Sequence, residues 1–202
     1  MHKLKLLVAP VLAVGLAVGA AAPAEAHHRS STPTKTITEI VAASGGTFDH
    51  NRYDYDILLN AVLAAKLEGA LADASKQYTV FAPSDAAFIR TARDLGFTGN
   101  GEQAAWEFLV GALTEIGGGD PIPVLTNILL YHVAGKSLSP LQVLLSRKID
   151  TLLGTSFKVN GIKLVDADPD ITNPSLNLFA LNIKATNGRI HGITRVLIPV
   201  NL

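Results

Sequence analysis

The chain of 202 residues contains no cysteine and only one methionine and one tryptophan. Without cysteine it can form neither a disulfide nor a thiolate metal site, and no lipid-modified cysteine can anchor it. Its charges balance, since 17 basic and 17 acidic residues give a formal net charge of zero. No basic run interrupts this balance, so the sequence lacks the electrostatic footprint of a protein that binds nucleic acid.

A usable N-glycosylation site is also missing. Asn173-Pro174-Ser175 carries proline at the position where the acceptor motif excludes it. We interpret the missing cysteines and the missing glycosylation site together as favouring a bacterial exported protein over an animal matrix protein.

The first 26 residues have the three parts of an export signal. Lys3 and Lys5 supply the positive start, Leu6 to Ala22 is apolar and uncharged, and Ala24-Glu25-Ala26 offers a cleavage site of small residues. The apolar stretch is shorter than the ~20 residues that a membrane-spanning helix needs. We therefore expect residues 1–26 to be a signal peptide and the mature protein to be secreted, extracellular or periplasmic.

The chain that follows the signal has the length of one domain. Cleavage after Ala26 leaves 176 residues, with 15 basic and 16 acidic side chains, which suffices for a domain of about 150 residues with its own core. Residues 27–35 are polar and aperiodic and predict a flexible leader. Residues 36–202 form the expected domain, without internal repeats. No second long apolar run occurs, so we expect contact with a membrane to be peripheral at most.

Helical periodicity dominates the first half of this domain. Apolar residues spaced i, i+3, i+4, i+7 from Tyr55 to Leu63 predict an amphipathic helix. Similar stripes predict helices near residues 37–44, 67–71, 106–116 and 121–132. Between them, Tyr78 to Ala82 is a run of β-branched and aromatic residues that predicts a buried strand. Ser84 is a suitable N-cap for a helix that begins at Asp85.

Hairpin signals dominate the second half. Asn160-Gly161 predicts a two-residue type I′ turn. This turn would place Val159 opposite Ile162 and Phe157 opposite Leu164. Lys158 and Lys163 would then lie on the face exposed to solvent. Asn187-Gly188 predicts a second turn of the same kind. That hairpin would place Ile183, Ala185 and Ile190 on one face, and Lys184, Thr186, Arg189 and His191 on the other. Helices followed by hairpins indicate an α+β fold with a largely antiparallel sheet.

Three segments in a fixed order carry a family resemblance. They are Tyr78 to Phe88 (YTVFAPSDAAF), Leu129 to Val133 (LLYHV) and Asn187 to Pro199 (NGRIHGITRVLIP). Together they resemble the fasciclin domain, an extracellular adhesion and interaction module, over roughly residues 36–202. The resemblance implies a wedge of two small, largely antiparallel β-sheets with helices packed along one edge.

The same resemblance implies interaction with other macromolecules and no catalysis. In this family the pair matching Tyr131-His132 supports the fold and lies in segments implicated in adhesion. Asn182-Ile183 occupies the place of an Asp-Ile pair tied to integrin binding, although its carboxylate is missing here. We expect an extracellular protein or glycan as the partner, and no cofactor or metal. The candidate interaction residues are Tyr131, His132, Asn182, Arg189 and His191.

Two other functions stay open at this point. A module that binds a lipid or another small ligand would use an apolar groove, for which the sequence offers only Trp106, Phe108 and the apolar residues around them. An exported hydrolase would need Ser84, Asp85 and His132 to assemble as a catalytic triad. Ser84 lacks the Gly-x-Ser-x-Gly elbow that such a nucleophile uses, which favours a structural role for His132.

One acidic segment resembles the start of a calcium loop. Asp166, Asp168 and Asp170 alternate along the chain, but Ile171 and Asn177 stand where such a loop needs glycine and glutamate. We therefore expect a solvated acidic loop at this place.

The predicted signal peptide can be tested on the native protein. Because the positive start, apolar core and cleavage site occur together, the mature chain should begin at or near His27. Mass spectrometry of the intact protein measures this. A mature species that keeps residues 1–26 and stays in the membrane contradicts the prediction.

Overall fold

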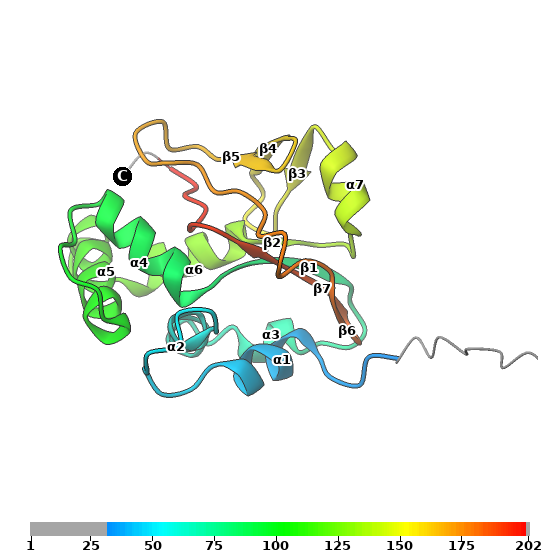
Figure 1. Ribbon diagram of the computed structural model, residues 1–202, viewed down its shortest axis with the longest axis horizontal. Coiled ribbons are helices and arrows are strands. Elements are labelled where there is room, and N and C mark those ends of the chain that lie inside the picture. Colours follow the sequence, from blue (N-terminus) through cyan, green and yellow to red (C-terminus); the bar gives the residue numbers. More distant parts are fainter. Residues whose placement is uncertain (1–31, 201–202) are drawn as a thin grey trace, which may run out of the picture. The chain divides into compact units, whose positions relative to one another are not determined.

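The computed structural model describes residues 32–200 (Figure 1). The predicted signal peptide and residues 27–31 of the predicted leader lie outside the described residues. Thr32 to Lys35 precede the first helix, and the Lys35 carbonyl accepts the Thr186 N–H at 2.8 Å. Contacts of the domain therefore begin one residue before the expected boundary.

Helices fill the first half of the described chain and most strands lie in the second, as predicted. The helices are α1 (Ile37–Ser44), α2 (Asp56–Ala64), α3 (Glu68–Leu71), α4 (Asp85–Asp94), α5 (Glu102–Ile116), α6 (Ile122–Tyr131) and α7 (Pro140–Leu145). The strands are β1 (Tyr78–Pro83), β2 (Val133–Ala134), β3 (Lys148–Asp150), β4 (Ser156–Asn160), β5 (Lys163–Val165), β6 (Ile183–Ala185) and β7 (Gly188–Ile193). Within residues 32–200, none of the helices has the length and apolar character that crossing a bilayer demands.

The strands form two small sheets, with the orders β2-β1-β7-β6 and β3-β4-β5. Four of the strand pairs are antiparallel. The exception is the pair β1–β7, which is parallel from Tyr78 opposite Gly188 to Pro83 opposite Ile193. The predicted α+β class with two small, largely antiparallel sheets is confirmed, and the parallel pair joins the first strand of the domain to the last.

Both faces of the four-stranded sheet are covered. Side chains alternate between the faces of a strand, so Val80 and Ile190 enter a core shared with α1 to α6, while Phe81 and Ile193 enter a second core shared with the three-stranded sheet. Figure 1 shows α1, α2 and α3 on one side of β1 and β7, and the three-stranded sheet on the other. This explains why all of β1 is buried, as its continuous apolar sequence predicted.

Local capping signals account for several helix starts. The Thr36 hydroxyl accepts the Glu39 N–H at 3.3 Å, and the Glu39 carboxylate accepts the Thr36 N–H at 2.7 Å, which makes a capping box for α1. Ser139 and Gln142 form the same box at α7, a helix that the sequence analysis missed. Ser84 takes the predicted N-cap position of α4, but its side chain makes no cap hydrogen bond.

The starts of α2 and α4 cap one another instead. The Asp85 carboxylate accepts the N–H groups of Asp56 at 3.0 Å and Ile57 at 2.8 Å, the first two of α2. In return, the carbonyls of Arg52 and Asp54 accept the first two N–H groups of α4, at 2.8 and 3.1 Å. The first two free N–H groups of each of these helices are thus satisfied, and the loop before α2 is fixed against α4.

The hairpin between β4 and β5 exists, but its predicted register is wrong. Asn160 pairs with Lys163, so the turn residues are Gly161 and Ile162 and not Asn160 and Gly161. Gly161 has a φ of +59°, and glycine at the first turn position is the pattern of a type II′ turn. As a consequence Ile162 is 45% exposed and does not face Val159.

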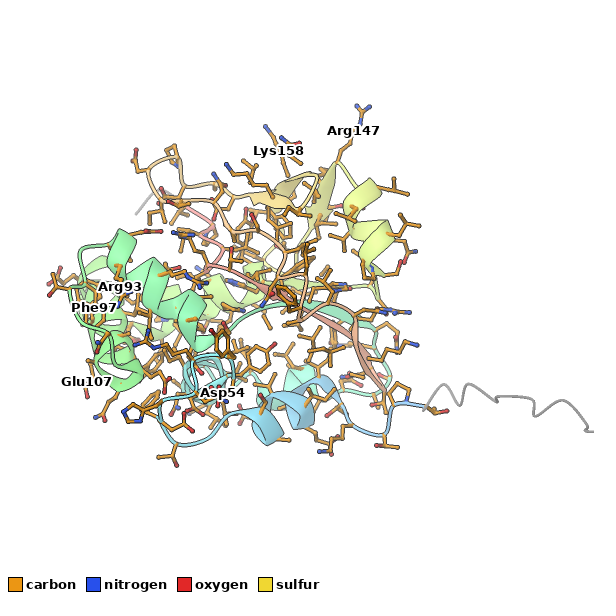
Figure 2. All side chains as sticks on the ribbon, in the orientation of Figure 1. Asp54, Arg93, Phe97, Glu107, Arg147 and Lys158 are labelled. Carbon is orange, nitrogen blue, oxygen red and sulfur yellow. The ribbon has the colours of Figure 1, made fainter. Side chains whose placement is uncertain are left out.

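Phe157 is likewise not opposite Leu164, because Leu164 pairs with Val159; Phe157 pairs with Ile149 of β3 on the other side of β4. The prediction of which side chains face the core and which face solvent was nonetheless correct. Phe157 and Leu164 are buried in the second core, whereas Lys158 and Lys163 are exposed. Figure 2 shows Lys158 pointing away from the three-stranded sheet.

The second hairpin differs from its prediction in the opposite direction, because it turns one residue earlier than predicted. Ala185 pairs with Gly188, so the turn consists of Thr186 and Asn187. Ile183 and Ile190 do share a face, as expected, because they pair directly.

The early turn places the Asn187 side chain inside the protein. Asn187 is fully buried, and its Oδ1 accepts the Ile37 N–H at 2.9 Å while its Nδ2 donates to the Leu71 carbonyl at 2.7 Å. This one amide therefore ties the β6–β7 turn to the start of α1 and the end of α3.

The positive φ of Gly161 can be tested by making the same substitution there and at a glycine whose φ is not positive. An added Cβ meets no atom within 4 Å at Gly161 or at Gly111 of α5, and only Gly161 of the two has positive φ. Gly161→Ala should therefore lower the free energy of unfolding by about 1–2 kcal/mol. Gly111→Ala should raise it by about 0.5–1 kcal/mol, because alanine favours a helix interior. Urea denaturation measures both, and equal effects would contradict the assigned turn.

Candidate functional site

His132 follows the last turn of α6 and has both ring nitrogens bound to backbone. Nδ1 donates to the Ile128 carbonyl at 2.7 Å, and Nε2 accepts the Leu197 N–H at 2.9 Å. Since one nitrogen donates and the other accepts, the ring is neutral, with its proton on Nδ1. Burial lowers the pKa of His132 to about 4. The expected role as a buried structural histidine is confirmed, with 3% of the residue exposed.

His191 of β7 is a second histidine of this kind. Its Nε2 donates to the Leu138 carbonyl at 2.9 Å, and its Nδ1 accepts the Asn182 N–H at 3.1 Å. Burial lowers the pKa of His191, and the nearby Arg189 charge lowers it further. The Arg189 guanidinium donates to Asn182 Oδ1, and Asn182 itself has a φ of +61°. These contacts fix the chain just before β6 on β7.

Tyr131 is also inside the fold. Its hydroxyl donates to the Ser156 carbonyl at 3.3 Å, and its ring meets Phe157 edge-on, with 5.8 Å between ring centres. Burial raises the pKa of Tyr131 to about 12. Tyr131 therefore links α6 to the three-stranded sheet.

The five predicted interaction residues thus separate into two groups. Tyr131, His132 and His191 are buried between packed layers, so they offer a partner no surface, and their expected place on a contact surface is corrected. Asn182 and Arg189 are half-buried and bound to each other. His191 is buried because the second core covers that side of β7, where its ring lies near Phe81.

A groove that the sequence analysis did not find lies elsewhere on the surface. Two adjoining hollows, of about 250 and 350 Å³, share the lining residues Tyr53, Ser84, Asn177, Phe179 and Ile193. We call this surface the Tyr53–Phe179 groove, because Tyr53 is 83% exposed and Phe179 is 102% exposed. Two large aromatic rings are thus presented to water beside one concave surface.

Backbone contacts hold the loop that carries Phe179. Asn177 Oδ1 accepts the Phe179 N–H at 3.1 Å, and the Asn177 N–H donates to the Gly192 carbonyl at 2.7 Å. The Gly192 N–H returns a bond to the Ala180 carbonyl at 2.7 Å. A Cβ at Gly192 would lie 2.7 Å from the Ala180 Cβ, so the loop can lie this close to β7 only over glycine. Tyr53 is held in turn by the loop fixed against α4.

Comparison with known families identifies the fold. The model of the Fasciclin domain matches residues 53–199. The chain belongs to the fasciclin domain family.

A solved structure with the same fold is that of a FAS1 domain pair from the insect cell adhesion molecule fasciclin I. It shares 14% identity with this fasciclin domain at a TM-score of 0.57, and the match covers 82% of this chain and 51% of that one. The chain thus spans about half the length of that structure, and at this identity the likeness shows the fold alone. No curated protein matches the chain.

The three segments that carried the resemblance meet at the centre of this fasciclin domain. Residues 78–88 form β1 and the start of α4, residues 129–133 lead from α6 into β2, and residues 187–199 contain β7. Because β2, β1 and β7 are neighbours in one sheet, the segments lie side by side although they are far apart in the sequence.

The geometry does not assemble Ser84, Asp85 and His132 into the catalytic triad that the hydrolase alternative requires. Both nitrogens of His132 are bound to backbone atoms, and the Asp85 carboxylate caps α2. His132 therefore has no free nitrogen with which to take a proton from Ser84.

The acidic loop at residues 166–170 differs from the solvated loop that we expected. Asp168 is 2% exposed, and its Oδ1 accepts the N–H groups of Asp170 at 2.8 Å and Ile171 at 3.0 Å. Asp166 Oδ2 accepts the Ile198 N–H at 2.9 Å, and burial raises the pKa of Asp166 to about 6. These carboxylates organise backbone amides, and only Asp170 of the three is exposed.

The neutral ring of His132 makes a pH-dependent prediction. An unfolded histidine titrates near pH 6.5, whereas His132 in the folded chain has a pKa of about 4. Between these values the unfolded chain binds more protons than the folded one. The stabilisation by the neutral ring is therefore complete above about pH 6.5 and is lost as the pH falls towards 4.

His132→Ala should lower the free energy of unfolding by about 1–3 kcal/mol at pH 7, because the Leu197 N–H and Ile128 carbonyl lose their partner. The gap between the two proteins should narrow as the pH falls to 4.5. Urea denaturation of both proteins at each pH measures the gap, and the comparison cancels the titration of carboxyl groups that they share. A gap that stays constant from pH 7 to 4.5 contradicts the assigned neutral ring.

Proposed function

We propose that this fasciclin domain is a non-catalytic extracellular interaction module that binds a glycan in the Tyr53–Phe179 groove. The observation that carries the proposal is Phe179, whose ring is fully exposed on a loop held by hydrogen bonds to the Asn177 side chain and to the backbone of β7. An apolar ring fixed in water forgoes the free energy of burial, which a partner on that surface would recover.

The lining of the groove favours a sugar as the occupant. The C–H face of a sugar ring packs on an aromatic face, and its hydroxyl groups need polar partners at the side. Ser84, whose side chain caps no helix, and Asn177 line both hollows together with Tyr53 and Phe179, and Arg90 lines the larger hollow. A protein partner would instead be favoured by a continuous apolar patch at the centre of the contact.

The family membership supports an adhesive role. Fasciclin domains are generally cell-adhesion modules, and the similar solved structure comes from an insect cell adhesion molecule. The predicted signal peptide would bring the domain to the outside of the cell. Both ring nitrogens of His132 are hydrogen-bonded to backbone groups, which supports the proposal that the domain is not catalytic.

The lipid-binding alternative loses support from the apolar cavities. The cavity lined by Trp106 and Leu109 has a volume of about 60 Å³, and that lined by Val41 and Leu58 about 30 Å³. Pockets for small ligands measure roughly 300–1,000 Å³. These two cavities are therefore interpreted as packing gaps in the core between the helices, because their volumes are smaller than that of a ligand site.

The proposed groove predicts a loss of binding without a loss of stability. Phe179→Ala and Tyr53→Ala should each weaken glycan binding by about tenfold or more, as at aromatic contact residues in general. The melting temperature of Phe179→Ala should stay unchanged, because its ring is fully exposed. Oligosaccharide arrays find the ligand and calorimetry measures its affinity.

Leu145→Ala is the matched control for this prediction. Leu145 is 75% exposed, but it lies on α7 and lines neither hollow. Equal weakening by Leu145→Ala would contradict the proposed groove. If the domain binds no glycan but binds a partner that protease treatment destroys, the partner is a protein and the proposed glycan is wrong.

A further inference from the structure

Carboxylates crowd the loop that leads into α2. One ligand oxygen each from Asp49, Asp54 and Asp56 lies within 4.8 Å of the others, and Figure 2 shows Asp54 beside α2. Glu102 at the start of α5 adjoins them, because its Oε2 accepts the Asp49 N–H at 2.8 Å. Four groups that can carry negative charge thus gather at one place in the fold.

No cation of the described protein balances these charges. Of the ion pairs formed within residues 32–200, none involves Glu102 or the three aspartates. Arg52, in the same loop, directs its guanidinium to the Asn100 carbonyl at 3.1 Å. Burial raises the pKa of Glu102, and the charges of the three aspartates raise it further, as expected where carboxylates crowd without a counter-ion.

Asp56 supplies an independent sign that a ligand belongs here. The residue is 2% exposed, its Oδ1 accepts the Gly46 N–H, and its Oδ2 has no hydrogen-bond partner among residues 32–200. The Asp49 N–H also faces Asp56, but Glu102 takes that hydrogen bond. A buried carboxylate oxygen without a partner is costly, and a bound cation would remove that cost.

The start of α2 does not account for the cluster. A helix start favours negative charge because its first N–H groups are free. In this protein the N–H groups of Asp56 and Ile57 are already bound by Asp85.

We propose that Asp49, Asp54 and Asp56 form a calcium site, with Glu102 as the adjoining fourth carboxylate. A set of oxygen ligands without histidine or cysteine favours a hard divalent cation. Ca²⁺ tolerates irregular ligand geometry, whereas Mg²⁺ needs a near-ideal octahedron. Calcium sites of extracellular modules typically have Kd values of about 10⁻⁴–10⁻³ M. The ion would also fix the loop that carries Tyr53, but the site does not rest on the proposed glycan function.

Terbium luminescence and thermal unfolding test this site on the purified full chain. Tyr53 and Tyr55 flank Asp54 in the sequence, so bound Tb³⁺ should luminesce when tyrosine is excited, and millimolar Ca²⁺ should displace it. After EGTA treatment, 5 mM Ca²⁺ should raise the melting temperature by about 2–4 °C. The same concentration of Mg²⁺ should have a much smaller effect, and an equal effect would overturn the assignment to calcium.

Asp54→Asn and Asp56→Asn should lose both responses, with at least tenfold weaker Tb³⁺ binding. The amide of Asp56→Asn keeps an oxygen for the Gly46 N–H, so the fold should hold. In EGTA both variants should melt at or above the wild-type temperature, because a like charge has been removed. Asp170→Asn is the control, since it removes the same charge from the exposed end of the other acidic loop, and it should keep both responses.

Two results would overturn the site. One is a wild-type protein without calcium stabilisation and without terbium luminescence. The other is a response that Asp54→Asn and Asp56→Asn retain, since the ion would then bind elsewhere on the surface. Should one of these two variants fail to fold, the other still decides between these outcomes, because each removes one ligand of the same proposed site.

Discussion

The parallel pairing of β1 with β7 is the constraint on which the rest of this fold depends. Both strands are buried, and buried backbone N–H and carbonyl groups must find partners within the protein. Residues 78–83 find them in residues 188–193 on one side, and on the other the Phe81 N–H donates to the His132 carbonyl at 2.9 Å. The first strand of the domain is thereby joined to the last, and each layer packs on a face of this pair.

Buried polar side chains connect the layers of this fold, a role that disulfides have in many other proteins. Asn187, His132 and His191 are each 3% exposed or less. Each uses both of its polar side-chain atoms to bind backbone groups, and each binds at least one segment far away in the sequence. Such groups stabilise a fold only while every bond is made. A chain without cysteine can hold its layers together in this way, and the neutral state of the two histidines is part of the arrangement.

The reciprocal capping of α2 and α4 connects the scaffold to both proposed sites. It fixes the loop before α2, and that loop carries Tyr53 at the groove and Asp54 in the carboxylate cluster. Loops held on a rigid scaffold are where binding residues commonly lie. In this domain the same few hydrogen bonds therefore position the Tyr53 ring of the proposed glycan groove and the Asp54 carboxylate of the proposed cation site.

The sequence by itself determined the helices of the first half, the buried strand β1 and the family, because periodicity and short motifs are local properties. The tertiary structure alone decided the two hairpin registers, since Gly161 and Asn187 take turn positions that pairing with neighbouring strands selects. It also decided that His191 is buried, and it brought together Tyr53 with Phe179 and Asp56 with Glu102. Burial and hydrogen-bond partners at these places come from segments far apart in the chain, and no local pattern in the sequence records which segments will meet.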